Sequence, residues 1–248
     1  MRSLANPILM FLASLGLLGS PLGSFATTPE DTPAVLSAPG NGVAREKLVF
    51  LFHHRPDWNR ERFQRHYVDI HAPLGLKYSR NLLGYTVNLV RSPSHWDAIT
   101  EQWVPYKEAI LDRRENSASP EDFKKVVGDV ISDGHGTTYV VEETVVRGEP
   151  ISTPLFHPTP GIKVVWLYTD ANRVPPPPAW AYRVVDNRVV SRLDIADPTQ
   201  NVWWKEVPPD IALIRTAWAH DSSALRRLNG ERTALMVTEY RFRASPWK

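Results

Sequence analysis

The chain has 248 residues, of which 42% are apolar and 23% are charged, and its formal net charge is +2. These values are typical of a globular protein of one or two domains, and they exclude disordered, collagen-like and coiled-coil chains. The near balance of charge excludes the broad basic surface that nucleic acids need, and the absence of cysteine excludes disulfides, thiolate metal sites and cysteine nucleophiles.

The first 26 residues have the layout of a secretory signal peptide. A short basic start precedes an uncharged apolar run over residues 8–19, and small residues at positions 24 and 26 suit a signal peptidase. We therefore expect export to the periplasm or the medium, with residues 27–46 as a tether. The apolar run is short for a spanning helix, so we expect no stable membrane insertion. A retained anchoring segment is the alternative.

Residues 47–147 predict one β-α-β-β-α-β unit, the order of a ferredoxin-like fold. Strands are expected over residues 47–54, 83–90, 98–104 and 138–146, and the two main helices over residues 59–71 and 119–130. Both faces of the first strand read as apolar, which predicts a buried central strand. Pro73 disfavours helical geometry at Ala72, so the first helix is expected to end near His71.

After a linker over residues 148–161, the segment 162–248 predicts a degenerate second copy of this α+β unit. Strands are expected over residues 162–168, 183–195 (with a turn at Asp186-Asn187), 211–218 and 233–242, with a short helix over residues 222–228. The prolines at positions 175–178 exclude the first helix of this copy. An unrelated β-rich extension is the alternative. If the copy is real, an α+β barrel closes within one chain and a homodimer becomes optional.

Histidines are the main candidates for chemistry. His71, at the expected helix C-terminus, would be held as an imidazolium and would serve as a general acid. The alternative is that His71 only caps the helix. His53 and His54 alternate across the first strand, so one of them faces each side, and the one that faces a cavity is a candidate base or substrate anchor. Tyr67 lies on the same helix stripe and is a further candidate acid or base.

Aromatic side chains around these groups predict a pocket for a flat or apolar compound. The candidate substrate-binding residues are Phe52, Phe63, Tyr85, Trp103 and His135. For Trp103 and Trp218 a core position is the leading expectation. His66 and His71 are five residues apart, which does not place two metal ligands on one helical face. We therefore predict no cofactor. Haem is the alternative, because a single histidine ligand leaves no spacing to test.

Three short motifs are similar to a known family. The run from Lys47 to Pro56, the segment Asn59–Phe63 and the sequence His71-Ala-Pro-Leu74 resemble the EthD-like branch of the dimeric α+β barrel superfamily. The closing strand Tyr139–Val146 continues the resemblance, which covers residues 46–147. One departure is His66-Tyr67, where the family usually carries Tyr-Trp.

The resemblance implies a cofactor-free dehydratase, cyclase or isomerase. Its substrate would be a small apolar or aromatic compound, polyketide-like or xenobiotic, transformed by general acid and base catalysis. The rival interpretation is a non-catalytic protein of the cell envelope that binds a hydrophobic ligand. A third is a haem-binding α+β barrel.

Overall fold

The computed structural model describes residues 44–107, 109, 136–193, 210–221, 228 and 234–244. The predicted signal peptide, the helix over residues 119–130, His135 and all but the last residue of the helix over residues 222–228 lie outside these ranges and stay predictions. Within the described part of the chain, no helix has the length and apolar character needed to span a bilayer.

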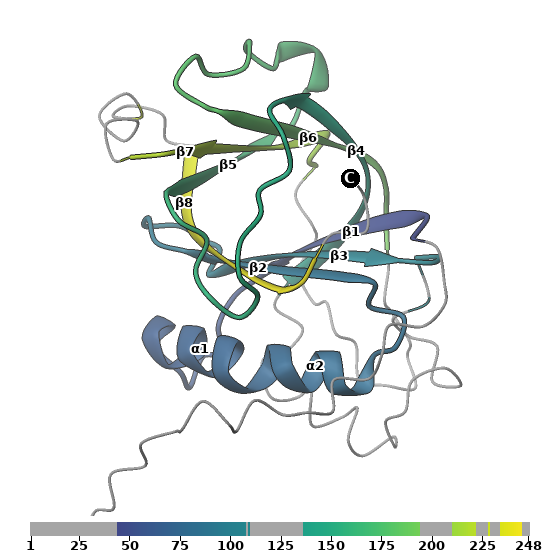
Figure 1. The fold of residues 1–248 in the computed structure, drawn as a ribbon, viewed down its shortest axis with the longest axis vertical. Helices are drawn as coiled ribbons and strands as arrows, with labels where there is room; N and C mark the ends of the chain where they lie inside the picture. The colour runs from purple at the N-terminus through teal and green to yellow at the C-terminus, as the bar shows by residue number, and fades with distance from the viewer. Residues whose placement is uncertain are drawn as a thin grey trace, which may run out of the picture. The chain divides into compact units, whose positions relative to one another are not determined.

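Eight strands, one long helical run and one short 3-10 turn make up the regular structure of the described residues (Figure 1). The strands are β1 (Glu46–Phe52), β2 (Gly84–Val90), β3 (Ala98–Val104), β4 (Gly136–Arg147), β5 (Ile162–Tyr168), β6 (Arg183–Arg192), β7 (Leu213–Ala219) and β8 (Ala234–Arg243). The helical elements are α1 (Arg60–His66), a π-helical segment η2 (Tyr67–His71), α2 (Ala72–Tyr78) and the short 3-10 turn η4 (Ala171–Arg173).

The strands close into a barrel in the order β1-β3-β2-β8-β5-β7-β6-β4. Every neighbouring pair is antiparallel. Strands β4-β1-β3-β2 form one half, and β8-β5-β7-β6 repeat the same connectivity in the other half. The pairs β2–β8 and β4–β6 join the two halves. This pattern confirms the predicted fold class, including the second repeat, and it is the architecture of a dimeric α+β barrel built within one chain.

The alternation of side chains in β1 separates two cores. Leu48, Phe50 and Phe52 pack outward with the helical run, whereas Val49 and Leu51 face the barrel interior together with residues from both halves. Figure 1 shows α1 and α2 on the outer side of β1, β2 and β3. A strand with two apolar faces is therefore explained by burial on both sides, as its sequence predicted.

The outer face of the second half is covered differently. Between β5 and β6 the only helical element is η4, followed by the proline run 175–178. Trp180 and Ala181, at the end of this loop, pack with the outward side chains of β5–β7. The loop thus takes the place of the helix that the prolines exclude.

One expected turn is absent. Strand β6 runs without a break through Asp186-Asn187, so the predicted turn there is wrong. Asn187 is buried, and its side-chain amide donates to the carbonyl of Ile214 on the neighbouring strand. This hydrogen bond gives the buried Asn187 amide a partner within the strand. Asparagine is frequent in turns, which is why the sequence alone predicted a turn here.

Candidate active site

The helical run that covers the first half continues past the point where the sequence predicts its end. Residues Arg60–Tyr78 are helical throughout, with the π segment in the middle. The backbone N–H of Ala72 donates to the carbonyl of Tyr67, five residues back. This wider turn gives the ring of Pro73 room that an α-helical turn would deny it. The predicted end at His71 is therefore wrong, and no helix C-terminus acts on the His71 charge.

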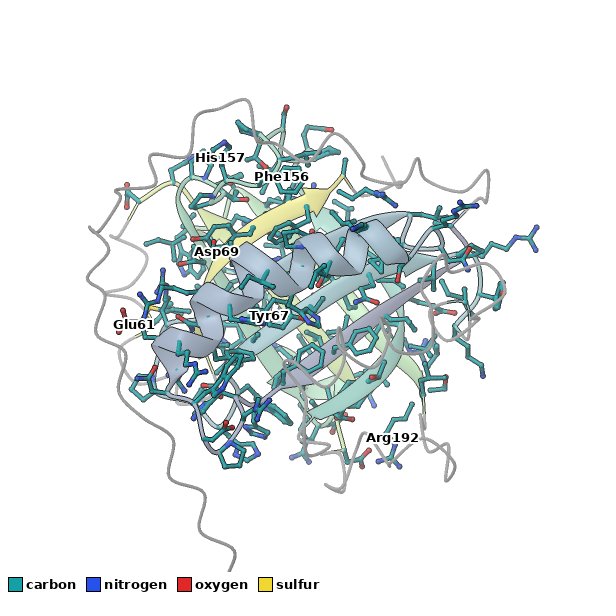
Figure 2. All side chains as sticks on the ribbon, turned by 90° about the horizontal axis from the view of Figure 1, so that it is seen from below. Glu61, Tyr67, Asp69, Phe156, His157 and Arg192 are labelled. Carbon is teal, nitrogen blue, oxygen red and sulfur yellow. The ribbon has the colours of Figure 1, made fainter. Side chains whose placement is uncertain are left out.

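The π segment brings Tyr67 and His71 together on the side that faces the strands. Their ring centroids are 4.7 Å apart. Tyr67 is 1% exposed and His71 is 9% exposed. Figure 2 looks onto the helical run from outside, with the strands behind it. Segments of π-helix are rare and occur often at functional sites, so this local geometry marks the Tyr67–His71 pair.

Tyr67 belongs to a buried group of three hydroxyls. Its phenol oxygen lies 2.9 Å from Oγ1 of Thr100 on β3, and it also hydrogen-bonds Tyr85 on β2. Burial raises the pKa of Tyr67 to about 12. Burial, followed by the neighbouring Tyr67, raises the pKa of Tyr85 well above its usual value. Both phenols therefore stay protonated near neutral pH and can donate hydrogen bonds, but neither is a base.

His54 lies on the same side of the sheet and is held by a buried carboxylate. Its Nδ1 is 2.6 Å from Oδ2 of Asp97, which also accepts the His54 backbone N–H at 2.8 Å. The other oxygen of Asp97 accepts from Nε of Arg60 at 2.6 Å. The His54 side chain is 35% exposed and that of Asp97 is 2% exposed. The Nδ1 edge of this imidazole is thus fixed by the protein, while another part of the ring is exposed to solvent.

The ionised state of Asp97 fixes the tautomer of neutral His54. Burial alone would raise the pKa of Asp97, but the hydrogen bonds from His54 and Arg60 outweigh it and lower that pKa. A carboxylate only accepts hydrogen bonds, so Nδ1 of His54 carries the proton. The lone pair of the neutral ring is then on Nε2. This is how a carboxylate orients a histidine that acts as a general base.

Aromatic rings connect His54 to the Tyr67–His71 pair. Phe63 lies between them, with centroid distances of 6.5 Å to His54 and 5.5 Å to Tyr67. Phe52 lies 6.0 Å from Tyr67 on the strand side. We call this arrangement of His54, Phe52, Phe63, Tyr67 and His71 the ring row.

The structure separates the remaining predicted site residues from the ring row. His53 points to the other side of the sheet and stacks on Trp96, with ring centroids 4.5 Å apart. Trp103 also lies on that side, where the ammonium group of Lys47 sits 4.6 Å from its ring. Tyr85 joins the ring row through Tyr67. His53 and Trp103 are therefore not part of one site with His54.

Sequence reasoning missed Asp97, Arg60 and Thr100. Asp97 precedes a strand and lies in no motif. Arg60 follows an N-cap inside the Asn59–Phe63 motif, but the motif assigns it no role. It also missed a charged cluster inside the barrel, centred on Lys47, Glu101 and Lys163. The available signal was the repetition of Lys47-Leu-Val-Phe-Leu as Lys163-Val-Val-Trp-Leu.

No family model matches the sequence, and no curated protein matches it. Several solved structures are similar. An anthrone oxidase-like protein shares 8% identity over 79% of this chain and 92% of its own, with a TM-score of 0.48. A proposed monooxygenase of Fusobacterium nucleatum shares 10% sequence identity over 81% of this chain and 94% of its own, with a TM-score of 0.43. A mutant chlorite dismutase from Candidatus Nitrospira defluvii shares 12% sequence identity over 79% of this chain and 91% of its own, with a TM-score of 0.39.

At these identities the likeness carries no statement about function, and the fold assignment rests on the strand pairings. The EthD-like resemblance stays a prediction.

The described residues offer little to a metal or a haem. They contain no cluster of three or more His, Asp or Glu side chains that could hold a metal ion. One cavity among them opens from the barrel interior, has a volume of about 60 Å³ and is lined by no histidine. A haem with one histidine ligand does not fit that cavity, because cofactor pockets are several times larger, roughly 300–1,000 Å³.

Proposed function

We propose that this chain is a cofactor-free enzyme that moves protons on a small apolar or aromatic compound at the ring row. The observation that carries the proposal is the short bond between Nδ1 of His54 and the buried carboxylate of Asp97. It gives a partly exposed imidazole a fixed orientation and a free lone pair on Nε2. A dehydratase, cyclase or isomerase needs such a base beside an apolar surface.

The buried phenols supply the complementary function. Tyr67 is protonated near neutral pH and already exchanges hydrogen bonds with Thr100 and Tyr85. A hydroxyl in such a network can stabilise negative charge on a substrate oxygen when the base removes a proton. His71, packed against the Tyr67 ring, is a further titratable group of the row. We assign proton abstraction to His54 and hydrogen-bond donation to the Tyr67 network.

The test uses nitrobenzisoxazole, an activated aromatic carbon acid. The rate of proton abstraction from this probe is measured by the change in absorbance as the product forms. We expect the wild-type protein to accelerate the reaction, with a rate that rises as a histidine loses its proton. His54→Gln should lower the rate about 10²- to 10⁴-fold. Asp97→Asn should also lower it, because an amide can donate to Nδ1 and favour the wrong tautomer. His157→Gln is the matched control, since His157 is exposed.

Melting temperatures of the same preparations separate chemistry from folding. If His54→Gln melts earlier but keeps its rate per folded molecule, the Asp97 contact is structural and His54 is not the base. A loss of rate in His71→Gln alone would assign the base to His71. If no variant changes the rate of the probe reaction, the proposal is wrong.

The second candidate function is non-catalytic binding of a hydrophobic ligand. The aromatic composition of the row favours it, because Phe52 and Phe63 flank the Tyr67 phenol beside the partly exposed His54. Fluorescence titration with a naphthalene probe distinguishes the two. Saturable binding that leaves every probe molecule unchanged supports the binding protein. An absorption spectrum of the purified protein tests the haem alternative independently.

A further inference from the structure

The barrel interior holds a charged cluster that the proposed function does not use. Its centre is Glu101, which accepts from Nζ of Lys47 at 2.6 Å and from Nζ of Lys163 at 2.7 Å. Lys163 also donates to Glu239 at 2.6 Å. All four side chains are 7% exposed or less. Buried charges of this kind need to be paired, so each donor and acceptor can be accounted for.

The two halves of the barrel provide an internal comparison. Lys47 pairs with Trp103 across β1 and β3, and Lys163 pairs with Trp218 across β5 and β7. Each ammonium group lies over its tryptophan ring, at 4.6 Å and 4.5 Å from the centroid. The surroundings of these two equivalent pairs then differ.

In the first half the lysine has a full set of partners. Nζ of Lys47 donates to Glu101, to Glu143 and to Oδ1 of Asn187, the last at 2.8 Å. An ammonium group has three N–H bonds, so Lys47 has none left.

In the second half the donors exceed the acceptors. Lys163 has two carboxylate partners among the described residues, which leaves one N–H over. Nε1 of Trp218 is buried and has no hydrogen-bond partner there. Arg183 sits opposite Trp218, where the first half has Gly84 opposite Trp103. Its guanidinium lies 5.6 Å from the Trp218 ring and donates to the carbonyl of Gly148, with no carboxylate partner in the described structure.

The three residues that carry these donors line one cavity. Its volume is about 60 Å³, and its wall includes Lys163, Arg183 and Trp218, with Pro150 and Ile151 from the linker among the other lining residues. The charged side chains of this wall, together with Lys47, comprise four cations and three carboxylates. The cluster therefore has a single positive charge in excess.

We infer that this cavity binds a small monovalent carboxylate of the size of formate or acetate. A planar carboxylate matches the fork of an arginine and accepts from the leftover N–H groups of Lys163 and Trp218. One negative charge neutralises the excess. The volume equals that of about two waters at roughly 30 Å³ each, which admits a few heavy atoms and excludes larger acids.

The test is titration of the full chain with sodium acetate and sodium formate in a low-salt buffer, followed by calorimetry and by melting temperature. We expect saturable binding and a higher melting temperature. Sodium chloride at equal ionic strength is the control for charge without the carboxylate fork, and benzoate is the control for size. Both should have little effect.

Variants locate the site. Arg183→Gln should weaken acetate binding about tenfold or more, because a charge-assisted bond is lost. Trp218→Phe keeps the ring packing, removes the indole N–H and should weaken binding several-fold. Arg188→Gln, an exposed cation on the same strand, should leave it unchanged.

If Arg183→Gln does not fold, the Trp218→Phe series decides. No saturable response to either carboxylate, an equal response to chloride, or unchanged affinity in Trp218→Phe and in any folded Arg183→Gln would overturn the inference. The readout is binding, so the result is independent of proton transfer at the ring row.

Discussion

Lys47 and Lys163 hold equivalent positions in the two halves of the barrel and donate to the two oxygens of one carboxylate, Glu101. The distances are 2.6 Å to Oε2 and 2.7 Å to Oε1. The position equivalent to Glu101 in the second half is Thr216, since each lies two residues before the paired tryptophan. The Glu101 side chain therefore links the two copies of the fold at the centre of the interior.

Replacing that carboxylate leaves two buried ammonium groups to share one amide oxygen. We expect Glu101→Gln to lower the free energy of unfolding by about 3–5 kcal/mol, the usual cost of breaking a buried ion pair from one side. Glu142→Gln, at an exposed position on β4, should change it by less than about 0.5 kcal/mol. Urea denaturation followed by tryptophan fluorescence measures both. Equal effects in the two variants would contradict the central role of Glu101.

The same cluster sets the acid limit of stability. Burial alone would raise the pKa of Glu101, but the ion pairs with Lys163 and Lys47 outweigh it and hold that pKa below the usual value of 4.5. The pKa of Glu239 is lowered in the same way, chiefly by Lys163 against its burial. A lowered carboxyl pKa stabilises the folded state above the unfolded pKa, and this contribution is lost as pH falls below about 4.5. Urea midpoints measured from neutral pH downward should fall steeply there, and less steeply in Glu101→Gln.

At high pH the opposite sign applies. Burial would lower the pKa of Lys47, yet Glu101 and Glu143 raise it above its ordinary 10.5. Burial raises the pKa of Tyr67 from 10.0 to about 12. Each group stabilises the folded state below its unfolded pKa, so stability should fall once the pH exceeds about 10. Tyr67→Phe should reduce that alkaline loss. If the loss of stability above about pH 10 is the same in this variant as in the wild type, the burial of a neutral Tyr67 phenol is contradicted.

Gly161 and Gly75 provide a matched pair of backbone tests. Gly161 has a φ of 87°, and a Cβ there would lie 2.4 Å from the carbonyl oxygen of Ala219. We expect Gly161→Ala to cost about 1–3 kcal/mol. Gly75, in α2, has only Cε1 of Tyr85 near, at 3.9 Å. Gly75→Ala should therefore stabilise the protein by about 0.5–1 kcal/mol. Thermal unfolding of both variants checks the signs, and equal signs would contradict the geometry.

The fragment 27–149 lacks the strands that close the barrel. In the full chain β2 pairs with β8 and β4 pairs with β6, so the fragment exposes both edges and the interior face. We expect it to dimerise by pairing β2 of one copy with β4 of another, or to aggregate. Light scattering after gel filtration measures its mass. A soluble monomer would contradict this expectation.

The sequence was sufficient for the order of strands and for the helix that the prolines exclude, because both depend on local patterns. It was insufficient for the barrel interior. Lys47 stands at the start of a strand that otherwise reads as apolar, and its partners Glu101 and Glu143 are 54 and 96 residues away. Residues so far apart in the sequence are brought together only by the register in which their strands pair, and local sequence patterns do not show that register. The continuation of the helix past Pro73 was missed for a related reason, since one π turn changes which carbonyl the proline ring meets.

Within the predicted site, alternation correctly separated His53 from His54 to opposite sides of the sheet, but it did not show which one had a partner. Asp97 reaches His54 because the chain returns beside the end of β1 just before β3. That contact depends on the loop between β2 and β3, for which a single sequence has no periodic signal.

The central carboxylate also bears on why the two halves share one chain. In an assembly of two identical chains every residue on the interior occurs twice, so its charges come in even numbers. One glutamate facing two lysines, or one arginine opposite a glycine, is then impossible without its mirror copy. When the two halves belong to one chain, interior charges no longer have to occur in pairs. Each half can change alone, and the interior can hold an odd charge that a symmetric pair would have to double or lose.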